Sequence, residues 1–441
     1  MGKIQNKTKE ANRVSRTGFG PRLTLTYPKN NGRWLRRVLA VAMMGYFASP
    51  QVVAQQATIR GKVIDGTTNQ PLEFVSVYLN TTTIGTLTNE KGDFSIPARV
   101  AGKYELVVSM VGYEPIIYAL DVNELPASFL FKLAPKDYAL KGITVKAKRD
   151  QEWYRNLEVF KENFLGRGDL ARQCKILNPE VLIIVFDPET GTLKVEAKDA
   201  IQIENLALGY KISYLLVGFE YLTRERFISY LGYPRYELIT GNARQQRRWE
   251  RNRLTAYHGS TMHFVRALRQ QRLEEEGFNL RRLIRMPNPD RPSPEAFEQA
   301  RAQLRARGDY DQVPEDDPIK VTLSKANLPE VLERLDTAKV PYQNYLQRDS
   351  SGVRMAFEGY FQVVYTGEKE EFSYIHSTSG PGPTRRPTFQ TSVLSLQTEW
   401  VQLDELGEFN PPLGVFVEGY WGWEKVSYSL PFDYRPDPQV P

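Results

Sequence analysis

The chain has 441 residues, of which 41% are hydrophobic and 12% aromatic, enough apolar material for ordered cores. At roughly 150 residues per domain, this length predicts two or three domains. The formal net charge of +6 is too small to indicate a nucleic-acid-binding protein.

An export signal is predicted at the start of the chain. The basic stretch RWLRR at 33–37 precedes an apolar run at 38–48, and VVA at 52–54 supplies small residues that a signal peptidase reads. We therefore assign residues 1–54 to a leader and signal peptide, cleaved after Ala54. A membrane anchor is the alternative, but the apolar run is shorter than the ~20 residues needed to span a bilayer. We expect a protein that is soluble or at most peripheral to a membrane.

Short alternating segments follow the leader and predict an all-β module. Hydrophobic and polar residues alternate at 59–63, as in a strand with one buried face. Further strands are predicted at 74–79, 94–96, 104–110 and 116–120, each bounded by residues that favour turns. This arrangement of short strands is typical of a β-sandwich. NEKG at 89–92 lies between two of the strands and predicts the turn of a hairpin.

The sequence GKVIDGTTNQPLEFVSVYLNTTTIGTLTNEKGDFSIP at 61–97, followed by YELVVSMVGYEP at 104–115, resembles the carboxypeptidase-regulatory-like domain of exported Bacteroidetes proteins. The resemblance implies a transthyretin-like (prealbumin-like) β-sandwich, which we assign to residues 55–148. It does not imply peptidase activity. The same module precedes the plug of many TonB-dependent receptors, and LKGITVKAK at 140–148 resembles the short strand that follows it there.

The remaining residues, 149–441, predict a larger α+β domain. Apolar residues at helical spacing from Trp153 to Phe164 indicate a helix that ends near Gly166. Strands are predicted at 181–186, 192–197 and 212–221, the first two forming a hairpin, and later at 357–365, 391–403 and 415–428. Helices are predicted at 260–277, 293–308 and 327–335, each beginning with a Ser or Asn that can cap it.

We expect strands from both ends of this domain to join one sheet. The predicted fold class is therefore mostly β plus α+β, with an N-terminal transthyretin-like sandwich followed by a larger α+β domain. CKILNPE at 174–180, AIQIENLALGYKISYLL at 200–216 and GYWGWEKVSYSLPFDY at 419–434 resemble the downstream region of other Bacteroidetes proteins that contain the regulatory-like module. That resemblance implies no activity.

No catalytic residue, cofactor or metal site is predicted. A metallocarboxypeptidase holds zinc with two histidines and a glutamate, and neither HxxE nor HExxH occurs in the sequence. His258, His263 and His376 are therefore expected to be structural. The single cysteine, Cys174, excludes an intramolecular disulfide, and without a nucleophile signature around it we expect a buried structural residue.

A basic helical face is the first candidate for a binding surface. Arg266, Arg269 and Arg272 fall on one side of the predicted 260–277 helix, where they could meet phosphate or carboxylate groups of envelope polymers. The alternative is an ordinary charged exterior, partly neutralised by the glutamates at 274–276.

An aromatic pair is the second candidate. Trp421 and Trp423 would project to the same side of the predicted 415–428 strand, where flat rings could stack on sugars or contact another protein. The alternative is that both rings pack in a core.

The predicted function is that of an exported, non-catalytic binding or structural protein of the bacterial cell envelope, in the periplasm or associated with the outer membrane. An envelope protein or a cell-surface polysaccharide is the expected partner. One alternative is an accessory of TonB-dependent nutrient uptake, suggested by the module alone. Another is an envelope hydrolase or carbohydrate-active protein, for which Asp404 and Glu408 could be proposed, but we interpret these two carboxylates as solvated surface charge.

Overall fold

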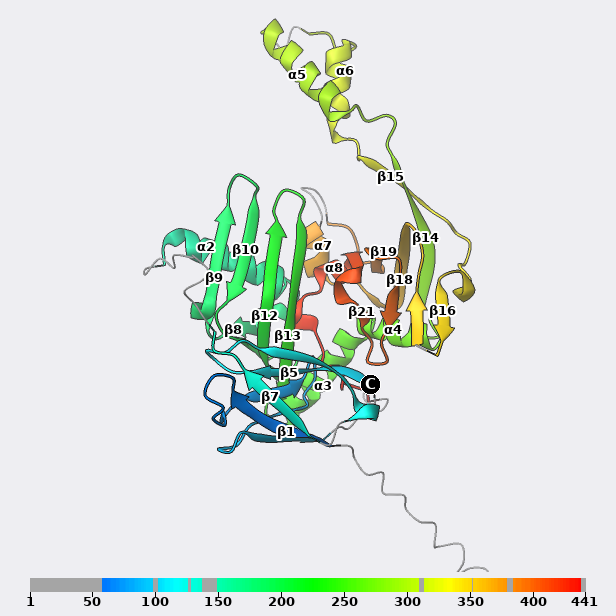
Figure 1. Ribbon diagram of the computed structural model, residues 1–441. Helices are drawn as coiled ribbons and strands as arrows, with labels where there is room; N and C mark the ends of the chain where they lie inside the picture. The colour runs from blue at the N-terminus through cyan, green and yellow to red at the C-terminus, as the bar shows by residue number, and fades with distance from the viewer. Residues whose placement is uncertain are drawn as a thin grey trace, which may run out of the picture. The chain divides into compact units, whose positions relative to one another are not determined.

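A computed structural model describes residues 58–97, 102–125, 128–136, 149–308, 313–350, 352–378 and 384–437 (Figure 1). The predicted signal peptide at 1–54, the LKGITVKAK segment at 140–148 and the predicted domain boundary at 148 lie outside these ranges. One compact unit, Gln56–Pro441, includes all the described residues.

The N-terminal part is a sandwich of two sheets, as predicted. Its strands are β1 (Thr58–Asp65), β2 (Ser76–Leu79), β3 (Gly85–Leu87), β4 (Asp93–Pro97), β5 (Lys103–Ser109), β6 (Ile116–Asp121) and β7 (Phe129–Leu133). One sheet has the order β4-β1-β7 and the other β3-β2-β5-β6. Alternate side chains of both sheets, such as Ile59, Val77 and Leu106, share one core, and this explains the alternation in the sequence.

The NEKG turn at 89–92 joins β3 to β4, but these two strands lie in different sheets. The predicted hairpin is therefore wrong, although the turn itself is tight. Gly92 has a φ of +75°, and a Cβ at this position would lie 2.4 Å from Val63 O. Glycine is needed because it tolerates this backbone conformation and leaves room for the neighbouring strand. The turn carries the chain from one layer of the sandwich to the other.

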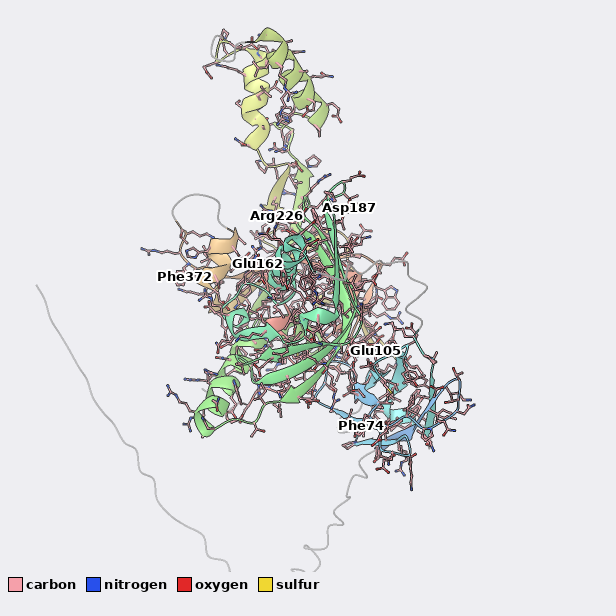
Figure 2. The ribbon with its side chains drawn as sticks, turned by 90° about the vertical axis from the view of Figure 1, so that its left-hand side faces the viewer. Phe74, Glu105, Glu162, Asp187, Arg226 and Phe372 are labelled. Carbon is pink, nitrogen blue, oxygen red and sulfur yellow. The ribbon has the colours of Figure 1, made fainter. Side chains whose placement is uncertain are left out.

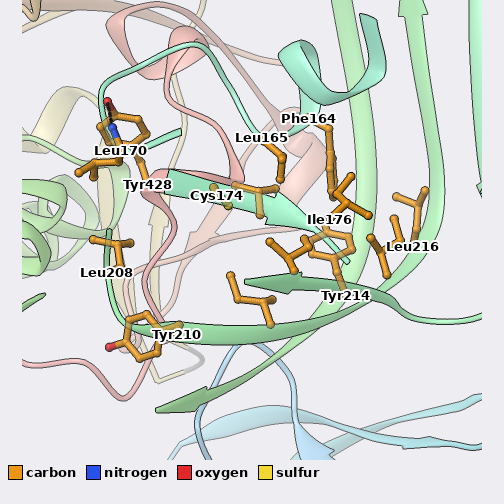
Figure 3. Close-up of a cluster of buried hydrophobic side chains, with 14 of the residues drawn as sticks. Phe164, Leu165, Leu170, Cys174, Ile176, Leu208, Tyr210, Tyr214, Leu216 and Tyr428 are labelled. Carbon is orange, nitrogen blue, oxygen red and sulfur yellow. Dashed lines mark hydrogen bonds between the residues drawn. The ribbon is translucent and has the colours of Figure 1, made fainter. Parts of the chain in front are cut away.

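A six-stranded antiparallel sheet follows the sandwich in the chain. Its strands are β8 (Cys174–Ile176), β9 (Leu182–Asp187), β10 (Thr192–Ala197), β11 (Ile201–Asn205), β12 (Tyr210–Leu222) and β13 (Phe227–Leu238). The pairing of β9 with β10 confirms the hairpin predicted from 181–186 and 192–197. The predicted helix is α2 (Gln151–Phe164), whose apolar stripe packs against this sheet (Figure 3).

The remaining strands form two further sheets, ordered β15-β14-β18-β19-β22 and β16-β17-β20-β21. Their bounds are β14 (Phe278–Pro287), β15 (Val331–Leu335), β16 (Leu346–Asp349), β17 (Gly352–Met355), β18 (Tyr360–Lys369), β19 (Phe389–Leu396), β20 (Val401–Leu403), β21 (Phe409–Asn410) and β22 (Val415–Gly419). Both sheets share a core with α4 (Thr261–Arg269). The expectation of one sheet from both ends of the domain is wrong, because the early and late strands pair in separate sheets throughout the described ranges.

Two of the three predicted helices differ from the structure. The 260–277 helix is α4, which begins after the cap Ser260 as expected but ends at Arg269. The 327–335 segment holds β15, because pairing with β14 overrides the local helical pattern. The third prediction is confirmed by α5 (Pro294–Arg307), which packs on α6 (Pro318–Ser324) beyond the β14–β15 ribbon (Figure 1).

Three further helices are α3 (Ala243–Tyr257), α7 (Phe372–Thr378) and α8 (Tyr420–Trp423). α3 begins with a capping box, in which Asn242 and Gln245 bond each other's backbone N–H. Within the described ranges, no helix combines the length and the apolar character needed to cross a membrane.

The loop between β2 and β3 fastens the sandwich to the rest of the chain. The Thr81 N–H donates to Pro234 O at 2.8 Å, and Thr82 forms a parallel β-bridge to Arg235 of β13. The Asp433 carboxylate accepts a hydrogen bond from the Thr83 N–H at 2.9 Å and another from the Thr83 hydroxyl. The sandwich is therefore bound both to the six-stranded sheet and to the segment at 424–437, called the C-terminal segment below.

Replacing Asp433 by Ala is expected to lower the free energy of unfolding by about 1.5–3 kcal/mol, because both hydrogen bonds to Thr83 involve a charged acceptor. Urea unfolding of the full-length chain measures this loss. Asp93→Ala, at an exposed position in β4, is the control for removal of a surface carboxylate. Equal stability of the two variants would show that the Thr83 contact does not hold the sandwich.

Candidate functional site

A cavity of about 460 Å³ lies where the sandwich, the six-stranded sheet and the C-terminal segment meet. Its aromatic wall includes Tyr214, Tyr230, Tyr236, Trp421, Tyr428 and Phe432, and its polar lining includes Asn80, Glu105, Ser260, Glu408, Glu424 and Lys425. Figure 2 labels Glu105, the sandwich carboxylate that reaches this lining. A cavity of this size that combines aromatic walls with convergent polar groups is typical of a small-molecule site.

A crevice of about 400 Å³ continues the cavity between the sandwich and the β20–β21 hairpin. The cavity and the crevice share Asn80, Glu105, Glu408, Pro412 and Phe432 as lining residues. The two spaces therefore adjoin, and Glu408 lies between them.

Two arginines of α4 hold the turn at 404–408, which joins β20 to β21 and carries Glu408. Arg266 Nε donates to Leu406 O at 3.0 Å, and Arg269 Nη1 donates to Leu403 O at 2.5 Å. The other nitrogens of Arg266 donate to the carbonyls of residues 432 and 434 at 3.0 and 3.1 Å. One guanidinium therefore fixes both the turn and the C-terminal segment at the edge of the cavity.

The predicted basic face on one helix is wrong, because α4 ends at Arg269 and Arg272 lies beyond it. Arg272 is exposed and pairs with Glu275 at 2.7 Å and with Glu276 at 3.1 Å. Arg266 and Arg269 bind backbone carbonyls of this chain, so their observed role is to position the turn. Neither arginine is among the residues that line the cavity.

Trp421 and Trp423 lie in α8, so the prediction that both rings project from one strand is wrong. Trp421 is buried against Phe264, with ring centres 5.1 Å apart, and its Nε1–H donates to Gly259 O at 2.6 Å. Trp423 is half-buried against Tyr374, with ring centres 5.5 Å apart. Core packing, the alternative, describes both side chains, although Trp421 also lines the cavity.

The interpretation of Asp404 and Glu408 as solvated surface charge is also wrong. Burial raises the pKa of Glu408 from 4.5 to about 8, with further contributions from the charges of Asp404 and Glu105. Burial raises the pKa of Asp404 as well, against the opposing charge of Arg269. The Glu408 carboxyl has no hydrogen-bond or ion-pair partner among the described side chains.

Glu424 and Lys425 are two further ionisable residues of the cavity. Burial, followed by the charges of Glu371 and Glu368, holds the pKa of Glu424 well above its ordinary value. Burial lowers the pKa of Lys425 from 10.5 to about 8. No described side chain pairs with either group, and both keep partial contact with the cavity. Because buried polar groups are nearly always hydrogen-bonded, we infer that water or a ligand supplies the partners of these two side chains.

The histidines and the cysteine lie outside this lining. His263 Nδ1 accepts from the Gly259 N–H at 3.2 Å, so its Nε2–H can donate to Glu276, also at 3.2 Å. Burial is the main cause that lowers the pKa of His263 to about 4. Cys174 is buried as predicted, and burial raises the pKa of its thiol to about 12, unsuited to nucleophilic attack at neutral pH. No group of three His, Cys, Asp or Glu residues in the described ranges could hold a metal ion.

Sequence reasoning missed Glu424 and Lys425 and misjudged Glu408. The signal that could have found them is a charge inside an apolar segment, as in GYWGWEKVSYSL at 419–430. Burial of such a charge costs free energy, so its presence there points to a partner or a function. The identity of the cavity's other walls could not be inferred, because Glu105 and Glu408 come from distant segments.

Residues 59–145 match the family model of the CarboxypepD_reg-like domain, which confirms the resemblance of the sandwich to that family. The chain is also 34% identical over 106 residues to the TonB-dependent receptor SusC of Bacteroides thetaiotaomicron. This match covers 24% of the chain and 10% of the receptor, so the chain spans about a tenth of the length of that curated relative.

Solved structures give weaker similarities. One is a cohesin–X-dockerin complex from Acetivibrio cellulolyticus, with 19% identity, coverage of 26% of this chain and 79% of that chain, and a TM-score of 0.16. Another is a protein of unknown function from Bacteroides fragilis NCTC 9343, with 10% identity, coverage of 82% and 96%, and a TM-score of 0.15. At these TM-scores neither structure bears on the fold or the function.

Proposed function

We propose that this chain is an exported, non-catalytic binding protein of the bacterial cell envelope, and that the cavity between its sandwich and its larger domain takes up a small ligand. The observation that carries the proposal is the convergence of Glu408, Glu424 and Lys425 on one cavity, each without a partner among the described side chains. Because these three groups have no protein partner to give up, a ligand can bind to them at little cost in free energy of reorganisation.

The envelope context is supported by the sandwich. Its match to the CarboxypepD_reg-like family and the partial similarity of the chain to the TonB-dependent receptor SusC favour a protein that works beside a TonB-dependent transporter. In this form of the proposal the chain is an accessory of nutrient uptake that presents or retains a ligand. The predicted signal peptide at 1–54 would deliver it to the periplasm or the outer membrane.

Recovery of the full-length gene product from the cells that make it tests both parts of the proposal. We expect the protein in the envelope fraction, and native mass spectrometry is expected to detect a bound small molecule. Val417→Phe, at a half-buried position of the cavity wall, is expected to abolish the adduct by filling the space. Val185→Phe, at an exposed position of β9, is the matched control. Protein in the cytosolic fraction would contradict export, and an adduct unaffected by Val417→Phe would contradict the cavity as the site.

A hydrolase is the second candidate, and one observation favours it. Glu408 has a pKa of about 8, and a carboxyl that stays protonated at neutral pH can act as a general acid, with the nearby Asp404 as the second carboxylate. The test is the release of reducing ends from envelope polysaccharides. Release that disappears in Glu408→Gln would support this candidate over a purely binding role.

A further inference from the structure

The crevice differs in charge from the protein as a whole. Its lining contains four carboxylates, from Glu105, Asp121, Asp404 and Glu408, and one lysine, Lys103. The chain itself carries a formal net charge of +6. The acidic crevice is therefore a local feature, built from β5 and β6 of the sandwich and from the 404–408 turn.

Two neighbouring carboxylates, those of Asp404 and Glu105, disfavour the ionised form of Glu408. After burial, the charges of Asp404 and Glu105 are what raise the pKa of Glu408. The carboxylate of the exposed residue Glu105 accepts a hydrogen bond from Asn80 Nδ2 at 2.7 Å. A cation placed among these groups would relieve the repulsion and favour the ionised form of Glu408.

Glu408 also provides an indication that is independent of the net charge. Glu408 is half-buried and lines both the crevice and the cavity, and its carboxyl bonds to none of the described side chains. A carboxyl that lines two adjoining hollows and has no protein partner can accept a hydrogen bond from a donor that enters them.

The cation that fits is organic rather than a metal ion. Metal ions need several ligands at short, convergent distances, and no set of three such residues in the described ranges meets that need. An ammonium group carries separate N–H donors that can reach separate acceptors. Tyr104 and Phe432 in the crevice add aromatic faces that a cation favours, and the tyrosines of the cavity can hold an apolar body.

We propose that the crevice and the cavity together bind a small organic ammonium ion, with its charged end beside Glu408 and a ring-bearing apolar body in the cavity. This inference rests on the proposed function, in which the cavity holds a ligand. Arg266 and Arg269 act as positioning residues, because they hold the turn that carries Glu408 without lining the space themselves.

The test compares three probes that share one body and differ in charge: 2-phenylethylamine, 2-phenylethanol and phenylacetate. Isothermal titration calorimetry with the full-length chain at pH 7 is expected to show binding of the amine at least about tenfold tighter than that of the alcohol, and weakest binding of phenylacetate. Glu408→Gln is expected to weaken the amine about tenfold and to leave the alcohol unchanged. Glu124→Gln removes an exposed carboxylate of the sandwich and is expected to change none of the three affinities.

The proposal is overturned if the amine binds no tighter than the alcohol, or if Glu408→Gln leaves its affinity unchanged. The proposed function is judged separately by the co-purified molecule and its loss in Val417→Phe. If the co-purified molecule is found and is lost in Val417→Phe, but 2-phenylethylamine binds no tighter than the alcohol, the ammonium ligand is rejected and the cavity remains the proposed binding site. If no molecule co-purifies and the amine is not preferred, the ligand-binding cavity and the ammonium ligand are both rejected.

Discussion

Replacing Phe164 by Ala is expected to lower the free energy of unfolding by about 3–5 kcal/mol, the cost of deleting a fully buried aromatic side chain. Phe164 has no exposed surface and lies where α2 meets the six-stranded sheet (Figure 3). Its ring stacks on Phe160 with centres 4.9 Å apart and meets the edges of Tyr214 and Tyr230 at 5.0 and 5.5 Å. Alanine would leave a cavity among these rings that the antiparallel strands cannot close.

Urea unfolding of the full-length chain, followed by circular dichroism, measures this effect. The matched control is Tyr154→Ala on the same helix, where the side chain is 57% exposed and the expected change is less than about 1 kcal/mol. If Phe164→Ala destabilised the chain no more than Tyr154→Ala, the packing of α2 on the sheet would be refuted.

Glu408→Gln is expected to stabilise the protein increasingly as the pH rises from about 5 to 8. In the folded chain the pKa of Glu408 is raised from 4.5 to about 8, so across this interval the unfolded chain loses the proton first. The contribution of the Glu408 carboxyl to the free energy of unfolding of the wild type therefore falls as the pH rises. Glutamine keeps the shape of the neutral group and does not ionise. After allowance for solvent screening, the gain at pH 8 is about 2–3 kcal/mol.

The measurement is the difference in unfolding free energy between the wild type and Glu408→Gln at a series of pH values. The difference is expected to be near zero below pH 4.5, where both states of the wild type are protonated, and to grow toward pH 8. Glu399→Gln, at an exposed position, is the control for loss of a surface charge. A difference that stays constant with pH would mean that Glu408 is solvated in the folded protein.

Local patterns predicted the sandwich and several elements of the larger domain. The alternation at 59–63 and the Ser caps before α4 and α5 are set by near neighbours in the sequence, and the structure agrees with them. Pairing between distant segments was beyond such patterns. Residues 331–335 form a strand because they pair with β14. The turn at 89–92 connects two different sheets because β3, which precedes it, pairs with β2, whereas β4, which follows it, pairs with β1.

The site was less predictable than the fold. The arginines at 266 and 269 were identified as notable, but their partners are carbonyls more than one hundred residues later in the chain, which no local pattern reveals. For Trp421 the structure agrees with the alternative interpretation, core packing, and the side chain is buried. The burial of Glu408 could not be predicted from its neighbours, because the glutamate of the same Gly-Glu-Phe sequence on an exposed turn would be an ordinary solvated charge.

The clasp between Thr83 and Asp433 has a consequence for the biosynthesis of the protein. The sandwich leaves the ribosome early, whereas the 404–408 turn, Glu424, Lys425 and the residue that fastens the sandwich all arrive in the last stretch of the described chain. A partly synthesised chain, or one cut after α7, lacks the three ionisable cavity residues Glu408, Glu424 and Lys425 and also Asp433. It keeps the other attachment of the sandwich, formed by Thr81 and Thr82 with residues 234 and 235. Under the proposed function, such a chain would keep one attachment of the sandwich and lose the three ionisable groups that would hold the ligand, so it would bind none.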